Sequence, residues 1–186
     1  MTTKKKETML IGTYHGHTLD LLYPDPADIY LSDIARALTR IPRYAGHGDE
    51  NYSIADHSVT LANLVPALRN DALLHDAAEA YIGDILAPLK DLVPEILRIE
   101  NHILQAIRTR FGLPPKPNPK LWAYDKAMLY VEQYYGLAPK GMQLPEENSS
   151  YREELFKQLQ RNGSQLISRG ITADDFAQLL RVALLP

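Results

Sequence analysis

The 186-residue sequence predicts an all-α helical bundle that carries a small β-hairpin near its N-terminus. Apolar residues recur at three- and four-residue steps over most of the chain, which is the spacing of one helix face. Capping residues or prolines stand before several of these stripes, as they do at helix starts. We expect residues 9–186 to form one domain, and residues 1–8, a basic stretch without an apolar run, to form a disordered tail.

The composition excludes several classes of protein. The chain has a formal net charge of −3, and a weakly acidic chain is a poor binder of nucleic-acid polymers. It has no cysteine, which excludes a disulfide framework, a thiolate zinc site and a cysteine nucleophile. No apolar run approaches the ~18 residues of a membrane span. We expect a protein of the cytoplasm, or of the host cytoplasm if the chain is of phage origin.

The first elements are predicted from turn and capping residues. Two short apolar runs flank Gly16 within residues 9–23, which predicts a hairpin, and the prolines of residues 24–26 end it. Ser32 is expected to cap the first helix, whose buried face carries Ile34, Leu38 and Ile41.

The following helices have start signals of their own. Ser53 and Asp56 form a capping-box pattern at the second helix, and Asp71 precedes the third. A fourth helix begins at Pro94 and stops at Gly112. Residues 113–119 predict a stiff linker. A fifth helix follows at about residues 119–135 and a sixth around residues 151–159. The last helix begins at Thr172, with Asp175 as its capping-box partner. The linker and the last helices complete the bundle or an interface, and we expect a homo-oligomer.

Three of the predicted helices each hold metal-type ligands at apolar positions. His57 stands on the apolar stripe of the second helix, His75 and Asp76 interrupt the third, and Asp125 lies among aromatic residues of the fifth. A single histidine on such a stripe is usually a hydrogen-bonded core residue. A carboxylate buried without compensation costs several kcal/mol, and a divalent metal would compensate for the whole set.

The ordered set His57, His75-Asp76 and Asp125 resembles the HD-domain metal-dependent phosphohydrolases. Residues 52–58 and 75–90 are similar to the YfbR-type 5′-deoxynucleotidase branch, and phage dATP triphosphohydrolases of the DatZ type belong to the same neighbourhood. The resemblance covers residues 12–132, about two thirds of the chain, and implies the helical bundle of an HD domain.

The resemblance also implies roles for individual residues. His57, His75, Asp76 and Asp125 would ligate one divalent transition metal, such as Co²⁺, Mn²⁺ or Zn²⁺, which would lower the pKa of a water and polarise phosphorus. Two carboxylates, Glu79 and Asp84, match catalytic residues, Glu79 as the acid or base. The substrate would be held by Arg43, Tyr44, His47 and Lys90.

Several assignments stay open at this point. Arg36 and Arg40 are alternatives to Arg43, because the spacing to His57 does not fix the alignment. Tyr44 would stack on a base or pack below its loop. Glu132, two helical turns after Asp125, is either a partner of the ligands or a surface charge, and we favour the surface charge. Three further histidines, His15, His17 and His102, have no partner by spacing and are expected to be structural or exposed.

The predicted function is hydrolysis of a deoxynucleotide by a metal-dependent enzyme. Attack on the α-phosphorus of a dNMP releases nucleoside and phosphate, and the same attack on a dNTP, dATP included, releases nucleoside and triphosphate. The alternative is a non-catalytic nucleotide-binding or regulatory module of the same type. A phosphodiesterase with two metals is disfavoured, because the sequence lacks a second His-Asp set.

Overall fold

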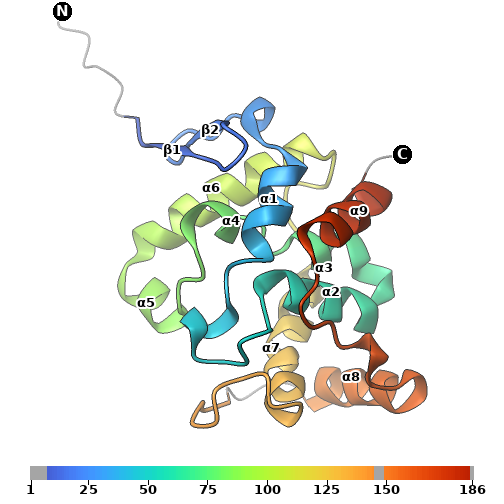
Figure 1. The fold of residues 1–186 in the computed structure, drawn as a ribbon. Coiled ribbons are helices and arrows are strands. Elements are labelled where there is room, and N and C mark those ends of the chain that lie inside the picture. The colour runs from blue at the N-terminus through green and yellow to red at the C-terminus, as the bar shows by residue number, and fades with distance from the viewer. Residues whose placement is uncertain (1–7, 145–148, 185–186) are drawn as a thin grey trace, which may run out of the picture.

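The computed structural model describes residues 8–144 and 149–184, which form a helical bundle with one antiparallel two-stranded hairpin (Figure 1). The predicted all-α fold with a small hairpin is confirmed. Apart from Thr8, the predicted tail lies outside the described residues. The strands and α-helices are β1 Leu10–Gly12, β2 Thr18–Asp20, α1 Leu31–Leu38, α2 Ile54–Leu64, α3 Arg69–Leu74, α4 Glu79–Ile82, α5 Ala87–Leu92, α6 Pro94–Arg110, α7 Pro119–Tyr134, α8 Ser149–Asn162 and α9 Ala173–Leu184.

Helix α2 is the centre of the bundle, and it is buried on nearly every side. The predicted capping box is present, because the Ser53 hydroxyl accepts from the Asp56 N–H at 3.1 Å and the Asp56 carboxylate accepts from the Ser53 N–H at 3.1 Å. The other carboxylate oxygen of Asp56 accepts from the Ser168 hydroxyl at 2.7 Å and the Ile171 N–H at 3.0 Å. One buried aspartate therefore begins α2 and also fastens the chain that leads into α9.

The first and last helices lie side by side, with α9 against α1, while α8 packs on α7 (Figure 1). The Thr172 hydroxyl accepts from the Asp175 N–H at 3.2 Å, so the predicted cap of α9 is confirmed. The predicted cap of α1 is wrong. Ser32 lies inside that helix, whose N-cap is Tyr30 without a side-chain bond, and Ile41 lies beyond its end.

The third predicted helix is divided in two. It begins at Arg69 rather than after Asp71, and regular helix stops at Leu74 and resumes at Glu79. The residues between form turns, in which the N–H groups of Ala77 and Glu79 bond to carbonyls three residues back, at 3.1 Å and 2.9 Å. This tighter winding is a common local departure at functional positions of helices. It falls on the His75-Asp76 pair.

The proline-rich linker before α7 is held by a buried arginine. The Arg108 side chain is fully buried, pairs with Asp71 at 2.7 Å, and donates to the carbonyls of Pro114 and Lys116 at 2.6 Å and 3.2 Å. This fixes where α7 starts, and therefore where Asp125 lies. Within residues 8–144 and 149–184, no helix combines the length and apolarity needed to cross a membrane.

Candidate metal centre

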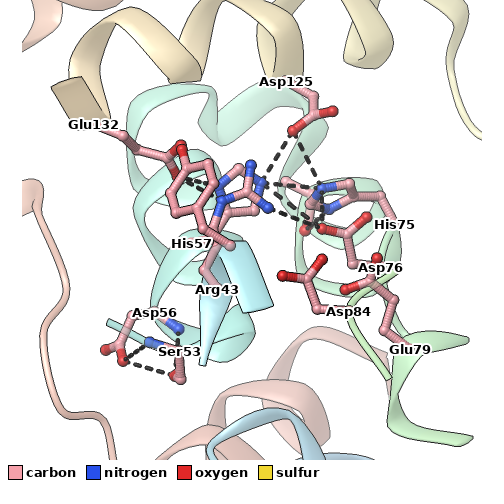
Figure 2. A network of polar contacts seen from close by, with 12 residues as sticks. Arg43, Ser53, Asp56, His57, His75, Asp76, Glu79, Asp84, Asp125 and Glu132 are labelled. Atoms are coloured by element: carbon pink, nitrogen blue, oxygen red, sulfur yellow. Dashed lines mark hydrogen bonds and ion pairs between the residues drawn. The ribbon is translucent and has the colours of Figure 1, made fainter. Parts of the chain in front are cut away.

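Side chains from α2, the 75–78 turns and α7 converge on one point (Figure 2). The Nε2 atoms of His57 and His75 lie 3.2 Å apart, and Asp125 Oδ1 lies 3.0 Å and 3.6 Å from them. The candidate ligand atoms of His57, His75 and Asp125 lie within 4.8 Å of one another, so this group could hold a metal ion. Asp76 Oδ2 lies 3.0 Å from His75 Nε2 and 3.9 Å from His57 Nε2, which brings the fourth predicted ligand to the same point.

The hydrogen bonds behind the two imidazoles fix which nitrogen faces the centre. His75 Nδ1 lies 2.8 Å from the Ala72 carbonyl oxygen, and His57 Nδ1 lies 2.6 Å from Glu132 Oε1. Since both oxygens accept, each Nδ1 carries the hydrogen, and each neutral ring turns a bare Nε2 toward the other. Two lone pairs at 3.2 Å, flanked by carboxylates, repel one another unless a cation or protons lie between them. The donor set therefore fits a divalent metal.

The pKa shifts in the cluster also agree with a site for a cation. Burial alone would raise the pKa of the Asp125 carboxyl, but its hydrogen bonds to His57 and His75 hold that pKa well below the usual value. Burial likewise opposes a proton on His75, yet the neighbouring Asp76 and Asp125 carboxylates raise the pKa of His75 well above its usual value. In the absence of metal the cluster therefore binds protons, which a metal would displace.

Glu132 belongs to this centre, and the expectation of a surface charge is wrong. The side chain is fully buried and pairs with the Arg43 guanidinium at 3.0 Å. It also accepts from His57 Nδ1, from the Tyr52 hydroxyl at 2.9 Å and from the Tyr44 hydroxyl. The signal in the sequence was its place two turns after Asp125 on one face of α7. Periodicity gives that face, but not the aromatic and cationic residues that cover it.

A further carboxyl group, that of Glu79, lies beside the ligand cluster at the start of α4 (Figure 2). It is 5% exposed, and burial together with the nearby Asp76 charge raises the pKa of Glu79 to about 9. Lys90 on α5 lies 3.4 Å from Glu79 Oε1 and 2.7 Å from Glu100 Oε1. The structure thus brings together Glu79 and Lys90, and it leaves Glu79 protonated near neutral pH.

The loop of residues 43–48 covers one side of the centre. Its backbone is strained, because Tyr44 and Ala45 both have positive φ, at 60° and 50°, where a Cβ is disfavoured. A Cβ on Gly48 would lie 2.5 Å from the Leu137 carbonyl oxygen, so only glycine fits where this loop meets the end of α7. The Ala45 N–H donates to Asp84 Oδ2 at 3.0 Å, which ties the loop to the turn after α4.

Only some of the predicted substrate-binding residues lie at the centre. Arg43 Nη1 lies 3.8 Å from Asp76 Oδ2, so Arg43 is the arginine of this site. Tyr44 turns its hydroxyl inward to Glu132 instead of offering it to solvent. His47 is exposed at the end of the turn, and its side chain forms no hydrogen bond or ion pair in the described part of the chain. The structure thus brings Arg43, Tyr44 and Lys90 to the cluster, but not His47.

Comparison with known proteins gives uncharacterized relatives. The chain is 45% identical to YfdR of Escherichia coli (strain K12) over 107 residues, which are 57% of this chain and 60% of that protein. It is 38% identical to an uncharacterized protein of Rhodobacter capsulatus over 110 residues, 53% of this chain and 56% of that one. The chain thus matches somewhat more than half the length of each of these curated relatives. No model of a known protein family matches it.

Proposed function

We propose that this chain is a metal-dependent phosphohydrolase of the HD type that acts on 5′-phosphorylated deoxynucleotides. The observation that carries the proposal is the convergence of the Nε2 atoms of His57 and His75 with the carboxylates of Asp76 and Asp125, beside the buried Glu79. The Nδ1 atoms of both histidines are engaged behind the rings, so their Nε2 atoms and the two carboxylates meet on the side where a metal could bind.

In this proposal His57, His75, Asp76 and Asp125 hold the metal. Two imidazoles and two carboxylates suit a borderline ion such as Co²⁺, Mn²⁺ or Zn²⁺. When bound, the ion would lower the pKa of a water and withdraw charge from the phosphoryl oxygens. Glu132 fixes the His57 ring from behind, and the Ala72 carbonyl does the same for His75.

Two cations flank the space that the phosphate would occupy. Arg43 is held by Glu132 through Nε, which leaves its terminal nitrogens directed toward Asp76 and the centre. Lys90 bridges Glu79 and Glu100. A guanidinium offers a planar pair of donors and an ammonium offers a compact charge, so together they neutralise charge on the phosphoryl oxygens in the transition state.

Glu79 supplies the proton for the leaving group. Its raised pKa means that the carboxyl keeps its hydrogen near neutral pH. As the bond between phosphorus and O5′ breaks, Glu79 donates this proton to O5′, while the oxygen of water bonds to phosphorus and the proton of that water passes to Asp84. Asp84 holds the 43–48 loop through the Ala45 N–H and keeps acceptor capacity for a proton of the substrate or water. A monophosphate releases phosphate, and a triphosphate releases triphosphate.

A substrate panel tests the proposal. The purified chain is incubated with each dNMP and dNTP and the matching ribonucleotides, with Co²⁺, Mn²⁺, Zn²⁺ or Mg²⁺, and released phosphate, triphosphate and nucleoside are separated by chromatography. We expect release from deoxynucleotides with a transition metal, and loss of metal and turnover in Asp76→Ala. Glu79→Gln should keep its metal while turnover falls ~10²–10⁴-fold. His102→Ala, an exposed histidine on α6, is the matched control.

The results separate the two readings of the site. Metal-loaded, folded chain that binds nucleotides without releasing any product would favour the non-catalytic module. Equal rates on ribo- and deoxyribonucleotides would remove the deoxynucleotidase assignment and keep only metal-dependent hydrolysis. Full turnover by Asp76→Ala after chelation would overturn the proposed site.

A further inference from the structure

A separate cavity of about 250 Å³ lies between the hairpin, α1 and α4. Its walls include Tyr14 from the loop of the hairpin, Asp33, Arg36 and Arg40 from α1 and the residues after it, and Tyr81 from α4. None of the metal-centre residues described above lines it. Two of its residues, Arg36 and Arg40, were candidates for the phosphate arginine, a role for which Arg43 is placed instead.

The two arginines are the first reason to expect an anion there. Arg36 and Arg40 are four residues apart, so their side chains leave the same side of the chain as it winds out of α1. Neither side chain forms an ion pair or hydrogen bond within residues 8–144 and 149–184. The Arg36 guanidinium carbon lies 3.3 Å from the centre of the Tyr14 ring, a contact that uses its flat face and leaves its N–H donors free.

The acidic residue of the cavity, Asp33, is already engaged. Its two oxygens accept from His15 Nδ1 at 2.5 Å and His17 Nδ1 at 2.7 Å, and the His17 ring stacks on Tyr30 at 3.6 Å. These contacts fasten the hairpin to α1 and so build one wall of the cavity. The cavity is therefore lined by two guanidinium groups and one carboxylate. Because that carboxylate is bonded to His15 and His17, the net charge in the cavity is positive.

Tyr81 provides a third donor. The residue is 8% exposed, and its buried hydroxyl lies near the Tyr30 backbone but makes no hydrogen bond of normal geometry to the described residues. Burial and the nearby Asp33 charge raise the pKa of Tyr81, so the group remains a neutral O–H. A buried hydroxyl without a partner is uncommon in native proteins, and a ligand is one way to satisfy it.

We propose that this cavity is a second anion site, distinct from the metal centre, that binds the phosphate group of a small molecule. Arg36 and Arg40 hold the phosphate, Tyr81 donates to it, and the exposed Tyr14 offers a ring edge to any organic part. The volume of about 250 Å³ is below that of most small-molecule pockets, which suits inorganic phosphate or a phosphomonoester. Because α4 carries both Tyr81 and Glu79, a ligand here also restrains the helix of the proposed acid.

The experiment follows the arginine side chains directly. The Nε–H signals of the full-length ¹⁵N-labelled chain are recorded in chelator, which prevents turnover, during titration with inorganic phosphate, dAMP or deoxyadenosine. Arg36→Gln and Arg40→Gln assign the two signals, and Arg181, an exposed arginine on α9, is the control within the same spectrum. The amide spectrum of each variant verifies that it folds.

We expect the Arg36 and Arg40 signals to shift and saturate with phosphate or dAMP, with no response to deoxyadenosine. A response to phosphate alone identifies an inorganic anion as the ligand, and a response to dAMP alone identifies a phosphomonoester. Arg36→Gln should raise the dissociation constant measured at Arg40 by about 10-fold or more, because it removes charge-assisted hydrogen bonds to the phosphate. Arg181→Gln should leave this constant unchanged. The proposal is overturned if neither signal responds, if Arg181 responds equally, or if deoxyadenosine gives the same shifts.

Discussion

At the scale of single residues, Glu132 determines which nitrogen of His57 carries the proton. A carboxylate at 2.6 Å from Nδ1 requires a hydrogen there, and Nε2 is then left bare for a metal. Burial opposes a charge on Glu132, but Arg43 and His57 outweigh it and hold its pKa below the usual value. The carboxylate therefore stays ionised, and it strengthens His57 as a ligand.

This role predicts a loss of metal affinity in Glu132→Gln. The amide keeps the shape of the side chain but carries no charge, so Arg43 loses its ion-pair partner and His57 its strongest acceptor. Changes of this kind behind a ligand commonly cost 10–100-fold in metal affinity. Calorimetric titration with Mn²⁺ measures the effect, and Glu153→Gln on the exposed face of α8 is the control. Unchanged affinity in Glu132→Gln would mean that the bond to His57 does not orient it.

Glu79 predicts a pH dependence of stability in the metal-free chain. Its pKa is about 9 in the folded state against a usual value of 4.5, so the folded state holds a proton that the unfolded state has released. The stability from this group is present below pH 4.5 and is lost as the pH rises toward 9. The free energy of unfolding therefore decreases steadily as the pH rises through that window.

Denaturant unfolding in chelator at several pH values checks this dependence. Glutamine resembles the protonated acid and does not titrate, so the stability of wild type relative to Glu79→Gln should fall as the pH rises. Glu153→Gln should give a curve parallel to that of wild type, because Glu153 is exposed. Parallel curves for Glu79→Gln and wild type would show that Glu79 is ionised in the folded state.

At the scale of elements, the 43–48 loop holds strain at the edge of the centre. Ala45 has a φ of 50°, and a left-handed conformation costs a non-glycine residue about 1–2 kcal/mol. Glycine removes that strain but adds about 0.4–1 kcal/mol of chain entropy to the unfolded state. We expect Ala45→Gly to raise the free energy of unfolding by about 0.5–1 kcal/mol, which is the difference between the two.

The neighbouring glycine provides the matched contrast. Gly46 has a φ of 82°, so Gly46→Ala should lower the free energy of unfolding by an amount similar to the gain expected for Ala45→Gly. Urea unfolding of both variants measures the two changes. If Ala45→Gly destabilises the chain as Gly46→Ala does, the loop conformation depends on the Ala45 methyl group and strain is not its main feature.

Local signals predicted most of the elements, and the errors lie at one helix start and at one break within a helix. The caps at Ser53 and Thr172 involve bonds within three residues, so the sequence is sufficient to predict them. Ser32 failed because α1 begins at Leu31 and lacks any side-chain cap at its start. The break after Leu74 was also missed, since its pattern of apolar residues continues through the turns.

At the site, the sequence predicted the ligand set but not the contacts that distant segments make with it. The residue types at positions 57, 75, 76 and 125 pointed to a shared centre, because ligands on apolar stripes need a common partner. The partners of Glu132 come from residues 43–57, some 80 residues away, and no local pattern reports them. Likewise, nothing in the spacing of His15 and His17 predicts that both bond to Asp33.

At the scale of the whole molecule, the bundle assembles a centre from segments far apart in the sequence. Asp125 depends on α7, whose start is fixed by the Arg108–Asp71 pair, and His57 depends on the cap that Asp56 shares with the chain before α9. The core that supports these helices is apolar and continuous without a metal. We therefore expect the chelated chain to remain folded, and the metal to add stability to a bundle that already exists.

Metal affinity should rise with pH. The Asp76 and Asp125 carboxylates hold the pKa of His75 above its usual value, so near neutral pH a metal must displace a proton from this ring. Titrations with Mn²⁺ in buffers of different ionisation enthalpy should show proton release that diminishes as the pH rises. Affinity independent of pH across this range would mean that His75 is already unprotonated in the metal-free protein.

Removal of the metal should lower the melting temperature without unfolding the chain. A ligand that binds only the folded state adds RT ln(1 + [L]/Kd), about 2.7 kcal/mol when its concentration is 100 times Kd. Asp76→Ala should lose most of this gain, because it deletes a carboxylate 3.0 Å from His75 Nε2, while His102→Ala should keep it. Circular dichroism melts with Mn²⁺ and with chelator measure both effects. An equal gain in Asp76→Ala and wild type would place the stabilising ion elsewhere, because Asp76→Ala removes one of the two carboxylates from the proposed centre.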